Sequence, residues 1–240
     1  MKSINELLLK IKNKKLLVIF PHPDDESFAS AGLILLAKRM GFIVNLLTLT
    51  KGGAGRVCIN PNGRSLKEVR SEELSKAASL LKIDNLILKD FDDGKLKIRN
   101  GWGRAVSEEI QKFDPGIVIT YDPTGITGHP DHINVGLGVK KIIHNIIGEK
   151  PTLLWVTFGN GNYIRLIPIA IKEYLTHPTY QLNMSLQVIM SKIGAMLCHR
   201  SQRYEQVFFI ILGMLIFRKE WYHKVDIKKD YPYKYINFNI

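Results

Sequence analysis

The sequence predicts an α/β fold, a mostly parallel sheet with helices on both faces, from three observations. Short apolar runs alternate along the chain with longer segments whose apolar residues recur at helical spacing. The short runs are apolar at most positions, which is typical of strands covered on both faces. Polar side chains follow several of these runs, at the edge where parallel strands end and where such folds build their sites.

The first elements follow directly from these patterns. A short amphipathic helix is expected within residues 3–13, where four apolar residues fall on one helical face. The apolar, β-branched run 16–20 predicts a strand. The leucine-rich segment 26–39 predicts a helix that stops at Gly41, because glycine is suited to helix ends. The apolar run 43–50 predicts the next strand.

The middle of the chain repeats the alternation. Residues 65–81 predict a helix because one of its sides is mainly apolar, and residues 86–88 predict a short strand. Residues 104–113 predict another helix, closed by an Asp-Pro pair, and residues 117–121 predict a strand. Each of these strands is expected to join its neighbour by a right-handed crossover.

The last third begins with a helix from Pro130 to about residue 147, opened by a proline at its first position. A strand is expected at 153–158, after which the alternation loosens. We interpret residues 160–180 as a lid or cap over the sheet edge.

Beyond that cap we expect helices over 184–200 and 207–217 and a partly extended, lysine-rich tail. The whole chain, residues 1–240, is therefore expected to form one domain. Its core would cover about residues 15–160, and the cap and C-terminal helices about residues 161–240.

The bulk composition narrows the compartment and the partners. The net charge of +12 favours an anionic partner, but the basic residues are scattered and no nucleic-acid-binding motif accompanies them, so no nucleic acid is expected. The two cysteines lie far apart, which excludes a disulfide framework and a cysteine metal site and favours a reducing, cytoplasmic location. The apolar run 207–217 is shorter than the ~20 residues of a membrane span. We expect it to be buried, with peripheral membrane contact as the alternative.

Two groups of metal-ligating side chains stand at strand-to-helix junctions. The first is the segment 20–26, Phe-Pro-His-Pro-Asp-Asp-Glu, which follows the strand at 16–20. The second is the segment 128–132, Gly-His-Pro-Asp-His, which comes shortly after the strand at 117–121. The imidazole and carboxylates of the first segment would repel one another without compensation, and a cation is the simplest compensation.

The predicted topology brings these two segments together, because all strands of a parallel sheet end at one edge. Histidines and carboxylates at one rim fit a zinc site with two His ligands, one carboxylate and a fourth position for water. Zinc lowers the pKa of such a water to about 7, and a carboxylate that is not a ligand can accept its proton. Either segment alone could also be a proline-stiffened turn at the start of a helix. The prediction of a zinc site therefore depends on the two segments occurring together.

These residues resemble the LmbE-like, or PIG-L, family of zinc-dependent N-acetylglucosaminyl deacetylases. The resemblance rests on the segments 21–26 and 129–132, which together are highly specific, and it covers about residues 15–205. Weaker matches are the glycine turn 50–55, Arg70 with Glu73, and the Phe-Asp-Asp-Gly loop at 91–94. A late helix pattern also matches, through Lys192, Ala195, His199, Ser201 and Gln202. The chain departs from the expected pattern at Pro21, where a small residue was expected.

The resemblance implies a Rossmann-like fold and a division of roles around the metal. His22, Asp25 and His132 are expected to bind zinc, with Fe²⁺ as the alternative metal in the cell. Asp24 is expected to act as the general base that activates the zinc-bound water.

Further roles also come from the resemblance. His129 would stabilise the oxyanion and protonate the leaving amine, with Asp131 orienting an imidazole behind it. Arg70 and Asp93 are expected to bind substrate, although an ion pair with Glu73 would explain Arg70 equally well and turn formation would explain Asp93. From sequence alone, His199 is expected to pair structurally within the late helix rather than to join the metal.

The sequence therefore predicts a zinc-dependent hydrolase that removes the N-acetyl group from an N-acetylglucosamine-type conjugate, which could be anionic or lipid-linked. One alternative is a metal-dependent amidase acting on a thiol or antibiotic-sugar conjugate. Another is a non-catalytic nucleotide-binding module that uses residues 51–55, whose glycine spacing does not match a dinucleotide fingerprint. Nucleotide affinity that survives Asp24→Ala would favour that module.

Overall fold

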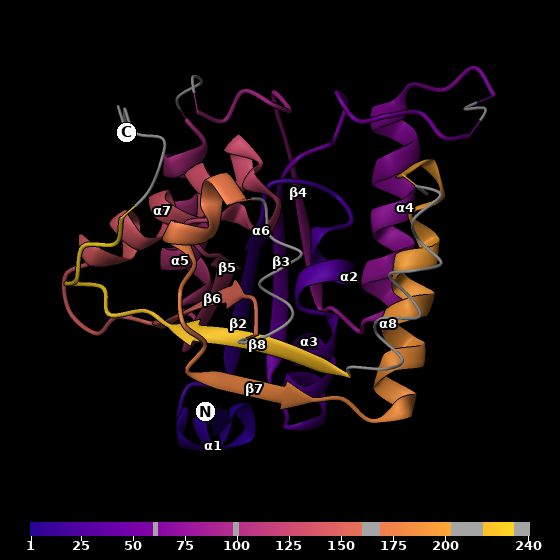
Figure 1. The fold of residues 1–240 in the computed structure, drawn as a ribbon. Coiled ribbons are helices and arrows are strands. Elements are labelled where there is room, and N and C mark those ends of the chain that lie inside the picture. The colour runs from indigo at the N-terminus through magenta and orange to yellow at the C-terminus, as the bar shows by residue number, and fades with distance from the viewer. Residues whose placement is uncertain (60–61, 98–100, 160–168, 203–217, 233–240) are drawn as a thin grey trace.

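The computed structural model describes residues 1–59, 62–97, 101–159, 169–202 and 218–232. Within them, one sheet of eight strands runs through the molecule (Figure 1). In chain order its strands are β1 (Lys2–Ser3), β2 (Lys15–Phe20), β3 (Ile43–Thr50), β4 (Asn85–Phe91), β5 (Ile117–Tyr121), β6 (Thr152–Thr157), β7 (Tyr180–Asn183) and β8 (Lys219–Lys224).

The strands lie in the spatial order β1-β7-β8-β6-β5-β2-β3-β4. Neighbours are parallel except at β8, which runs antiparallel to both β6 and β7. The predicted α/β class with a mostly parallel sheet is thus confirmed. From β2 the chain goes to β3 on one side and later returns to β5 on the other. Strand order therefore reverses between β2 and β5, and such a switch point opens a crevice at the carboxyl ends of the strands.

Helices cover both faces of the sheet. The α-helices of the described residues are α1 (Ile4–Lys10), α2 (Asp25–Ala29), α3 (Ala31–Arg39), α4 (Leu66–Leu80), α5 (Trp102–Phe113), α6 (Gly125–Gly128), α7 (Pro130–His144) and α8 (Leu186–Cys198). Two 3₁₀ helices are η2 (Ile169–Tyr174) and η3 (Arg200–Gln202). Among these helices, not one combines the length and the apolar character that crossing a membrane requires.

The alternation of side chains along β2 builds two cores. Leu16, Val18 and Phe20 join the core under α3, α4 and α8, whereas Leu17 and Ile19 join the core under α5 and α7. Figure 1 shows the same division, with α5 and α7 on one side of the strands and α3, α4 and α8 on the other. Burial on both faces explains why the strand sequence is apolar throughout.

The helix predicted at 26–39 is interrupted, which corrects that expectation. Ser30 has φ −145° and ψ 14°, so α2 ends there and α3 begins at the next residue. The carboxylate of Glu220, on β8, accepts hydrogen bonds from the backbone N–H groups of Gly32 and Leu33 at 2.9 and 3.0 Å. A helix start capped from a distant strand gives no local sequence signal, because the capping side chain is not a neighbour in the chain.

The sheet extends beyond the core expected at 15–160. Strands β7 and β8 lie within the region expected to form a cap and C-terminal helices, and β1 precedes the expected core. The strand predicted at 86–88 also extends further, as β4. The helix predicted at 207–217 lies outside the described residues, and so does the part of the segment 160–180 that covers residues 160–168.

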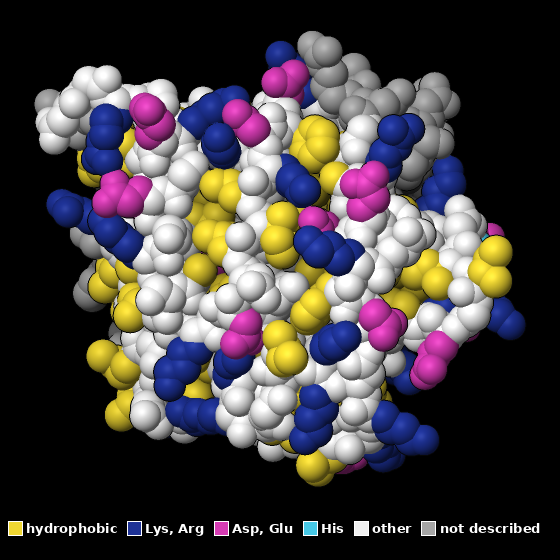
Figure 2. All heavy atoms as spheres, turned by 180° about the vertical axis from the view of Figure 1, so that it is seen from behind, with side chains coloured by type: hydrophobic (Ala, Val, Ile, Leu, Met, Phe, Trp, Pro, Cys, Tyr) yellow, Lys and Arg dark blue, Asp and Glu magenta, His cyan; other side chains and the backbone are white. Residues whose placement is uncertain are grey.

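The basic side chains are dispersed on the back of the molecule. Figure 2 shows Lys and Arg side chains spread across that face, with Asp and Glu side chains between them. Among the basic side chains of the protein, Lys38 forms an ion pair with Asp84 at 2.6 Å and Lys67 with Asp90 at 2.7 Å. On this face the basic side chains are thus interspersed with acidic ones and do not gather in a single patch.

Candidate active site

The two predicted histidine segments meet at the switch point of the sheet. β2 and β5 are hydrogen-bonded neighbours, and each leads into one of the segments. His22 Nδ1 lies 3.2 Å from His132 Nε2, although the two residues are separated by 110 positions in the chain. The spatial convergence that the sequence predicted is therefore confirmed.

Three side chains converge with the spacing of metal ligands. Asp25 Oδ1 lies 3.4 Å from His132 Nε2, and Asp25 Oδ2 lies 3.8 Å from His22 Nδ1. Tetrahedral zinc with bonds of 2.0–2.1 Å holds its ligand atoms about 3.3 Å apart. Two nitrogens and a carboxylate at these distances can therefore hold one divalent cation with little movement.

The chain offers other groupings around the same imidazole. His129 and His132 can join His22 in a set whose nitrogen atoms lie within 4.8 Å of one another. Asp93 and Asp131 can join His22 in a second set, on the other side of its ring. His22 is thus common to every grouping found among the described residues.

The converging ligands are held in place by neighbouring groups. Asp25 accepts hydrogen bonds from the backbone N–H of His22 at 2.9 Å and from the Tyr121 hydroxyl at 2.7 Å. His132 Nδ1 lies 3.0 Å from the carbonyl oxygen of Gly125, so Nδ1 carries the proton and Nε2 is left as a lone-pair donor. The Tyr121 and His132 rings stack at 4.3 Å with an interplanar angle of 6°. The sequence gives no signal for this role of Tyr121, because a tyrosine at a strand end has many ordinary explanations.

Two carboxylates face the outer nitrogen of His22. Its Nε2 lies 2.9 Å from Asp93 Oδ1 and 3.2 Å from Asp131 Oδ2. Burial opposes a positive charge on His22, but hydrogen bonds to Asp131 and Asp93 prevail and raise its pKa to about 10. Burial likewise opposes the charge of Asp93, and its hydrogen bond to His22 lowers its pKa to about 2.

Asp131 is fixed by the loop that follows β4. Its carboxylate accepts the backbone N–H groups of Gly94 at 2.8 Å and Leu96 at 3.1 Å. The side chain is fully buried. Asp131 was expected to orient an imidazole, and the ring its carboxylate contacts is that of His22.

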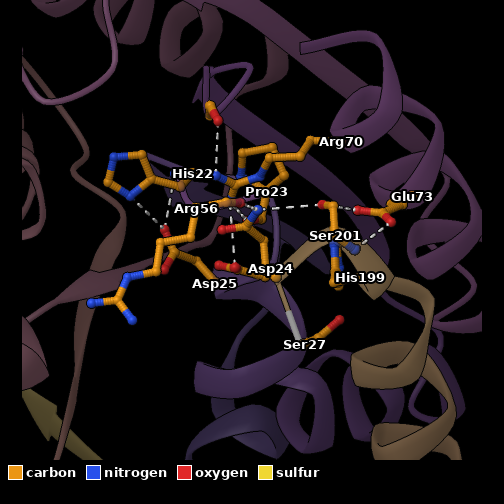
Figure 3. A network of polar contacts seen from close by, with 12 residues as sticks. His22, Pro23, Asp24, Asp25, Ser27, Arg56, Arg70, Glu73, His199 and Ser201 are labelled. Carbon is orange, nitrogen blue, oxygen red and sulfur yellow. Dashed lines mark hydrogen bonds and ion pairs between the residues drawn. The ribbon is translucent and has the colours of Figure 1, made fainter. Parts of the chain in front are cut away.

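Asp24 stands at the start of α2 in an unusual backbone conformation. Its φ is +100° and its ψ is −27°, a region that favours glycine. Arg70 Nη2 donates to the Pro23 carbonyl oxygen at 2.5 Å and lies 3.3 Å from Asp24 Oδ2 (Figure 3). Burial and then the charge of Asp25 raise the pKa of Asp24 to about 7, the range in which a general base works well at neutral pH.

His129 caps the helix that carries His132. Its Nδ1 accepts the backbone N–H of Asp131 at 3.2 Å. Burial lowers its pKa, so the ring is neutral near pH 7. A neutral imidazole whose Nδ1 accepts must carry its proton on Nε2. His129 therefore presents an N–H donor as it lines the cavity.

Arg70 is buried, and its guanidinium group donates hydrogen bonds to main-chain carbonyl oxygens. Besides Pro23, it donates to the Gly52 carbonyl oxygen at 2.9 Å. A Cβ atom on Gly52 would lie 2.3 Å from the guanidinium carbon, and Gly52 also has φ +66°. The glycine turn thus makes room for Arg70. The alternative ion pair with Glu73 is replaced by other contacts, because the Glu73 carboxylate accepts from the Ser201 hydroxyl and backbone N–H.

A cavity of about 530 Å³ opens beside these groups. Its polar lining includes side chains of the two histidine segments together with Arg70 and Asp93. The lining also includes larger apolar side chains, namely Phe28, Met184, Val156, Phe158 and Trp221. This volume is typical of a small-molecule site, and the mixed lining suits a ligand with one polar and one less polar part.

His199 was expected to pair within the late helix, and the structure corrects this. His199 Nε2 lies 2.8 Å from Glu26 Oε1, and both side chains are buried. The contact joins the end of α8 to the segment that carries Asp24.

The chain matches a family model and is similar to proteins named as deacetylases. Residues 17–143 match the family model described as "PIG-L: GlcNAc-PI de-N-acetylase". A protein of Bacillus anthracis named "Probable N-acetyl-alpha-D-glucosaminyl L-malate deacetylase 2" is 29% identical over 202 residues, which are 81% of this chain and 89% of that protein. The "Diacetylchitobiose deacetylase" of Thermococcus kodakarensis is 32% identical over 202 residues, covering 81% of this chain and 72% of that protein.

A solved structure supports the fold. The N,N'-diacetylchitobiose deacetylase from Pyrococcus horikoshii superposes with a TM-score of 0.71 at 19% sequence identity. The superposition covers 94% of this chain and 92% of that one. At this level of identity the likeness concerns the arrangement of strands and helices.

Proposed function

The chain belongs to the PIG-L family, the GlcNAc-PI de-N-acetylase family, and from this premise we propose how its site works. It is a metal-dependent N-deacetylase, a hydrolase that removes the acetyl group from a small N-acetylglucosamine-type conjugate. The observation that carries the proposal is the meeting of His22, Asp25 and His132 beside Asp24 in one cavity.

His22 Nδ1, His132 Nε2 and an Asp25 oxygen hold the metal in this proposal. The two nitrogens lie 3.2 Å apart, Asp25 Oδ1 lies 3.4 Å from His132 Nε2, and Asp25 Oδ2 lies 3.8 Å from His22 Nδ1. These separations are close to those around a tetrahedral ion, and two imidazoles with one carboxylate are a donor set that suits zinc. When bound, zinc lowers the pKa of a water ligand and polarises the acetyl carbonyl. Asp131 orients His22 from behind by accepting the Nε2 proton, a common support for a metal-binding imidazole.

Asp24 acts as the general base. It lines the cavity next to Asp25, and its pKa of about 7 lets it take a proton from the attacking water and release it again. The water oxygen forms a bond to the acetyl carbon while its proton passes to Asp24. The carbon–nitrogen bond of the amide then breaks, and the products are acetate and the free amine.

His129 stabilises the charge that develops on the acetyl oxygen. Its Nδ1 is occupied by the backbone N–H of Asp131, so the Nε2 proton is the one available in the cavity. A fixed donor at an oxyanion stabilises the transition state more than the substrate. The same proton can then pass to the leaving amine.

Arg70 and Asp93 bind the sugar in this proposal. Both line the cavity. Asp93 Oδ2 accepts the backbone N–H of Ala54 at 2.8 Å, so the carboxylate is fixed and can accept from a sugar hydroxyl. The net charge of +12 supports an anionic group beyond the sugar.

Acetate release tests this function. The purified protein is incubated with N-acetylglucosaminyl malate, diacetylchitobiose, N-acetylglucosaminyl inositol and a short-chain N-acetylglucosaminyl phosphatidylinositol. We expect acetate from at least one conjugate, its loss after chelation, and its return when Zn²⁺ is added. The absence of metal-dependent acetate release from the whole panel, in protein that binds zinc, would contradict the proposal.

A further inference from the structure

The main chain of Asp24 adopts a conformation that other parts of the protein must hold. With φ +100° and a side chain larger than glycine, Asp24 lies in a region that L residues rarely adopt. Residues persist in such a conformation only where their surroundings determine it. The contacts around Asp24 therefore decide where its carboxylate points.

Two side chains contact this turn directly. Arg70 donates to the Pro23 carbonyl oxygen on the peptide that precedes Asp24. Glu26 Oε2 accepts the backbone N–H of Asp24 at 3.1 Å. The two contacts fix both ends of one peptide unit, and they fix it only if Glu26 itself keeps a single orientation.

His199 supports Glu26 from a remote helix. The Glu26 side chain is fully buried, and its Oε1 accepts from the Ser27 hydroxyl at 2.5 Å and faces His199 Nε2 at 2.8 Å. His199 is 2% exposed, and its Nδ1 finds no hydrogen-bond partner among the described residues. Among the described residues, Glu26 is thus the hydrogen-bond partner of the His199 imidazole.

We propose that His199, acting through Glu26, is a positioning residue for the general base. It holds the Asp24 peptide in its left-handed conformation, so that the Asp24 carboxylate stays directed into the cavity. This inference rests on the proposed role of Asp24. It predicts that α8, which packs against α4 and α2, is coupled to the catalytic turn through one hydrogen-bonded chain, His199–Glu26–Asp24.

The chain offers a matched control for a purely structural contact. Ser201 lies two residues beyond His199, is fully buried, and donates its hydroxyl to Glu73 on α4 at 2.6 Å. Ser201→Ala removes a buried contact between the same segment and a helix without touching Glu26. His199→Leu removes the donor to Glu26 while keeping most of the side-chain volume, and His199→Gln restores an N–H donor.

The test compares kinetics with hydrogen exchange. We expect His199→Leu to lower kcat about 10- to 100-fold, the range typical of supporting residues, with KM and bound metal within twofold of the wild type. His199→Gln should recover part of kcat. By mass spectrometry, backbone hydrogen exchange in the peptide containing residues 22–28 should accelerate in His199→Leu and not in Ser201→Ala.

Several outcomes overturn the inference while leaving the proposed function standing. One is wild-type kcat and wild-type exchange in His199→Leu. Another is an equal loss of kcat in His199→Leu and Ser201→Ala, accompanied by loss of metal, which would indicate general loosening. If His199→Leu does not fold, His199→Ala takes its place. If the wild type releases no acetate, the proposed function fails, and the exchange measurement still decides whether His199 holds the turn.

Discussion

Two clusters of buried charged side chains line the same cavity and differ in how their charges are satisfied. One lies where β8 meets α3 and contains Lys192 and Glu220, whose side chains are 3% and 4% exposed. The other lies at the ends of β2 and β5 and contains the proposed metal ligands. Burial is similar in both, so the difference lies in their partners.

The cluster at β8 is complete without a ligand. Glu220 accepts from Lys192 Nζ at 2.7 Å, from the Tyr222 hydroxyl at 2.7 Å, and from two backbone N–H groups at the start of α3. Lys192 also donates to the Phe28 carbonyl oxygen at 2.8 Å. Each charge therefore finds its compensation within the chain, which is how buried ions are normally tolerated.

The cluster at β2 and β5 contains an excess of acceptors. Asp25 and the Nε2 atom of His132 face the inner nitrogen of His22, and two more carboxylates face its outer nitrogen. A single imidazole cannot compensate three carboxylates, whereas a divalent cation can. A cluster whose buried charges are balanced by other protein groups contributes to the structure of the fold. A cluster with more buried carboxylates than protein cations is suited to bind a metal ion.

The largest effect should come from removing a proposed ligand. His132→Ala should lose the bound metal and reduce acetate release to background, because only two of the three converging ligand atoms remain. Metal content after dialysis and acetate release are measured together, with His144→Ala as a control on the same helix. Full metal content in an inactive His132→Ala would assign His132 a role other than ligand.

The next largest effect should come from the base. Asp24→Asn should lower kcat by about 10²- to 10⁴-fold, the contribution typical of general base catalysis, while the protein keeps its metal. This variant distinguishes the role of the proton acceptor from the role of the metal ion. A variant that loses its metal as well would place Asp24 among the ligands, and one with full kcat would exclude it as the base.

The meeting of the two histidine segments could be predicted from sequence, because each segment follows a strand of the predicted parallel sheet. His22, Asp25 and His132 each lie in a short segment with its own proline and carboxylate signals. The cluster at β8 could not be predicted in this way. Glu220 lies in a polar, lysine-containing segment, and its partners on α3 are 187 and 188 positions away.

The sequence also could not predict which partners the terminal polar groups of long side chains contact. Arg70 and Glu73 are correctly spaced for an ion pair on one helix, yet they turn to the Pro23 carbonyl and to Ser201. His199 stands at a helix end, and only packing of α8 brings it to Glu26. Spacing along one element predicts neighbours on that element and says nothing of contacts made across elements.

A smaller effect should come from the support behind His22. Asp131→Asn should weaken metal binding about 10- to 100-fold. The two carboxylate oxygens of Asp131 accept from His22, Gly94 and Leu96, whereas an amide has only one acceptor oxygen for these three donors. Competition with a chromogenic chelator measures the affinity. Asp90→Asn, an exposed carboxylate at the end of β4 paired with Lys67, is the control and should keep wild-type affinity.

The smallest effect on catalysis should come from the cluster at β8. Lys192→Met leaves Glu220 charged and buried without its cation, which should destabilise the fold by about 3–5 kcal/mol. The double variant Lys192→Met/Glu220→Gln removes both charges and should cost less than the single one, because the unpaired charge is gone. Urea unfolding measures both.

Metal content and kcat, measured well below the unfolding transition, should stay near wild type in both variants, since neither residue contacts a proposed ligand or Asp24. This result would separate the two clusters. A loss of metal in Lys192→Met that the double variant reverses would mean that the charge of Glu220 reaches the metal cluster across the cavity. The two clusters would then be one electrostatic unit, and the distinction between them would not hold.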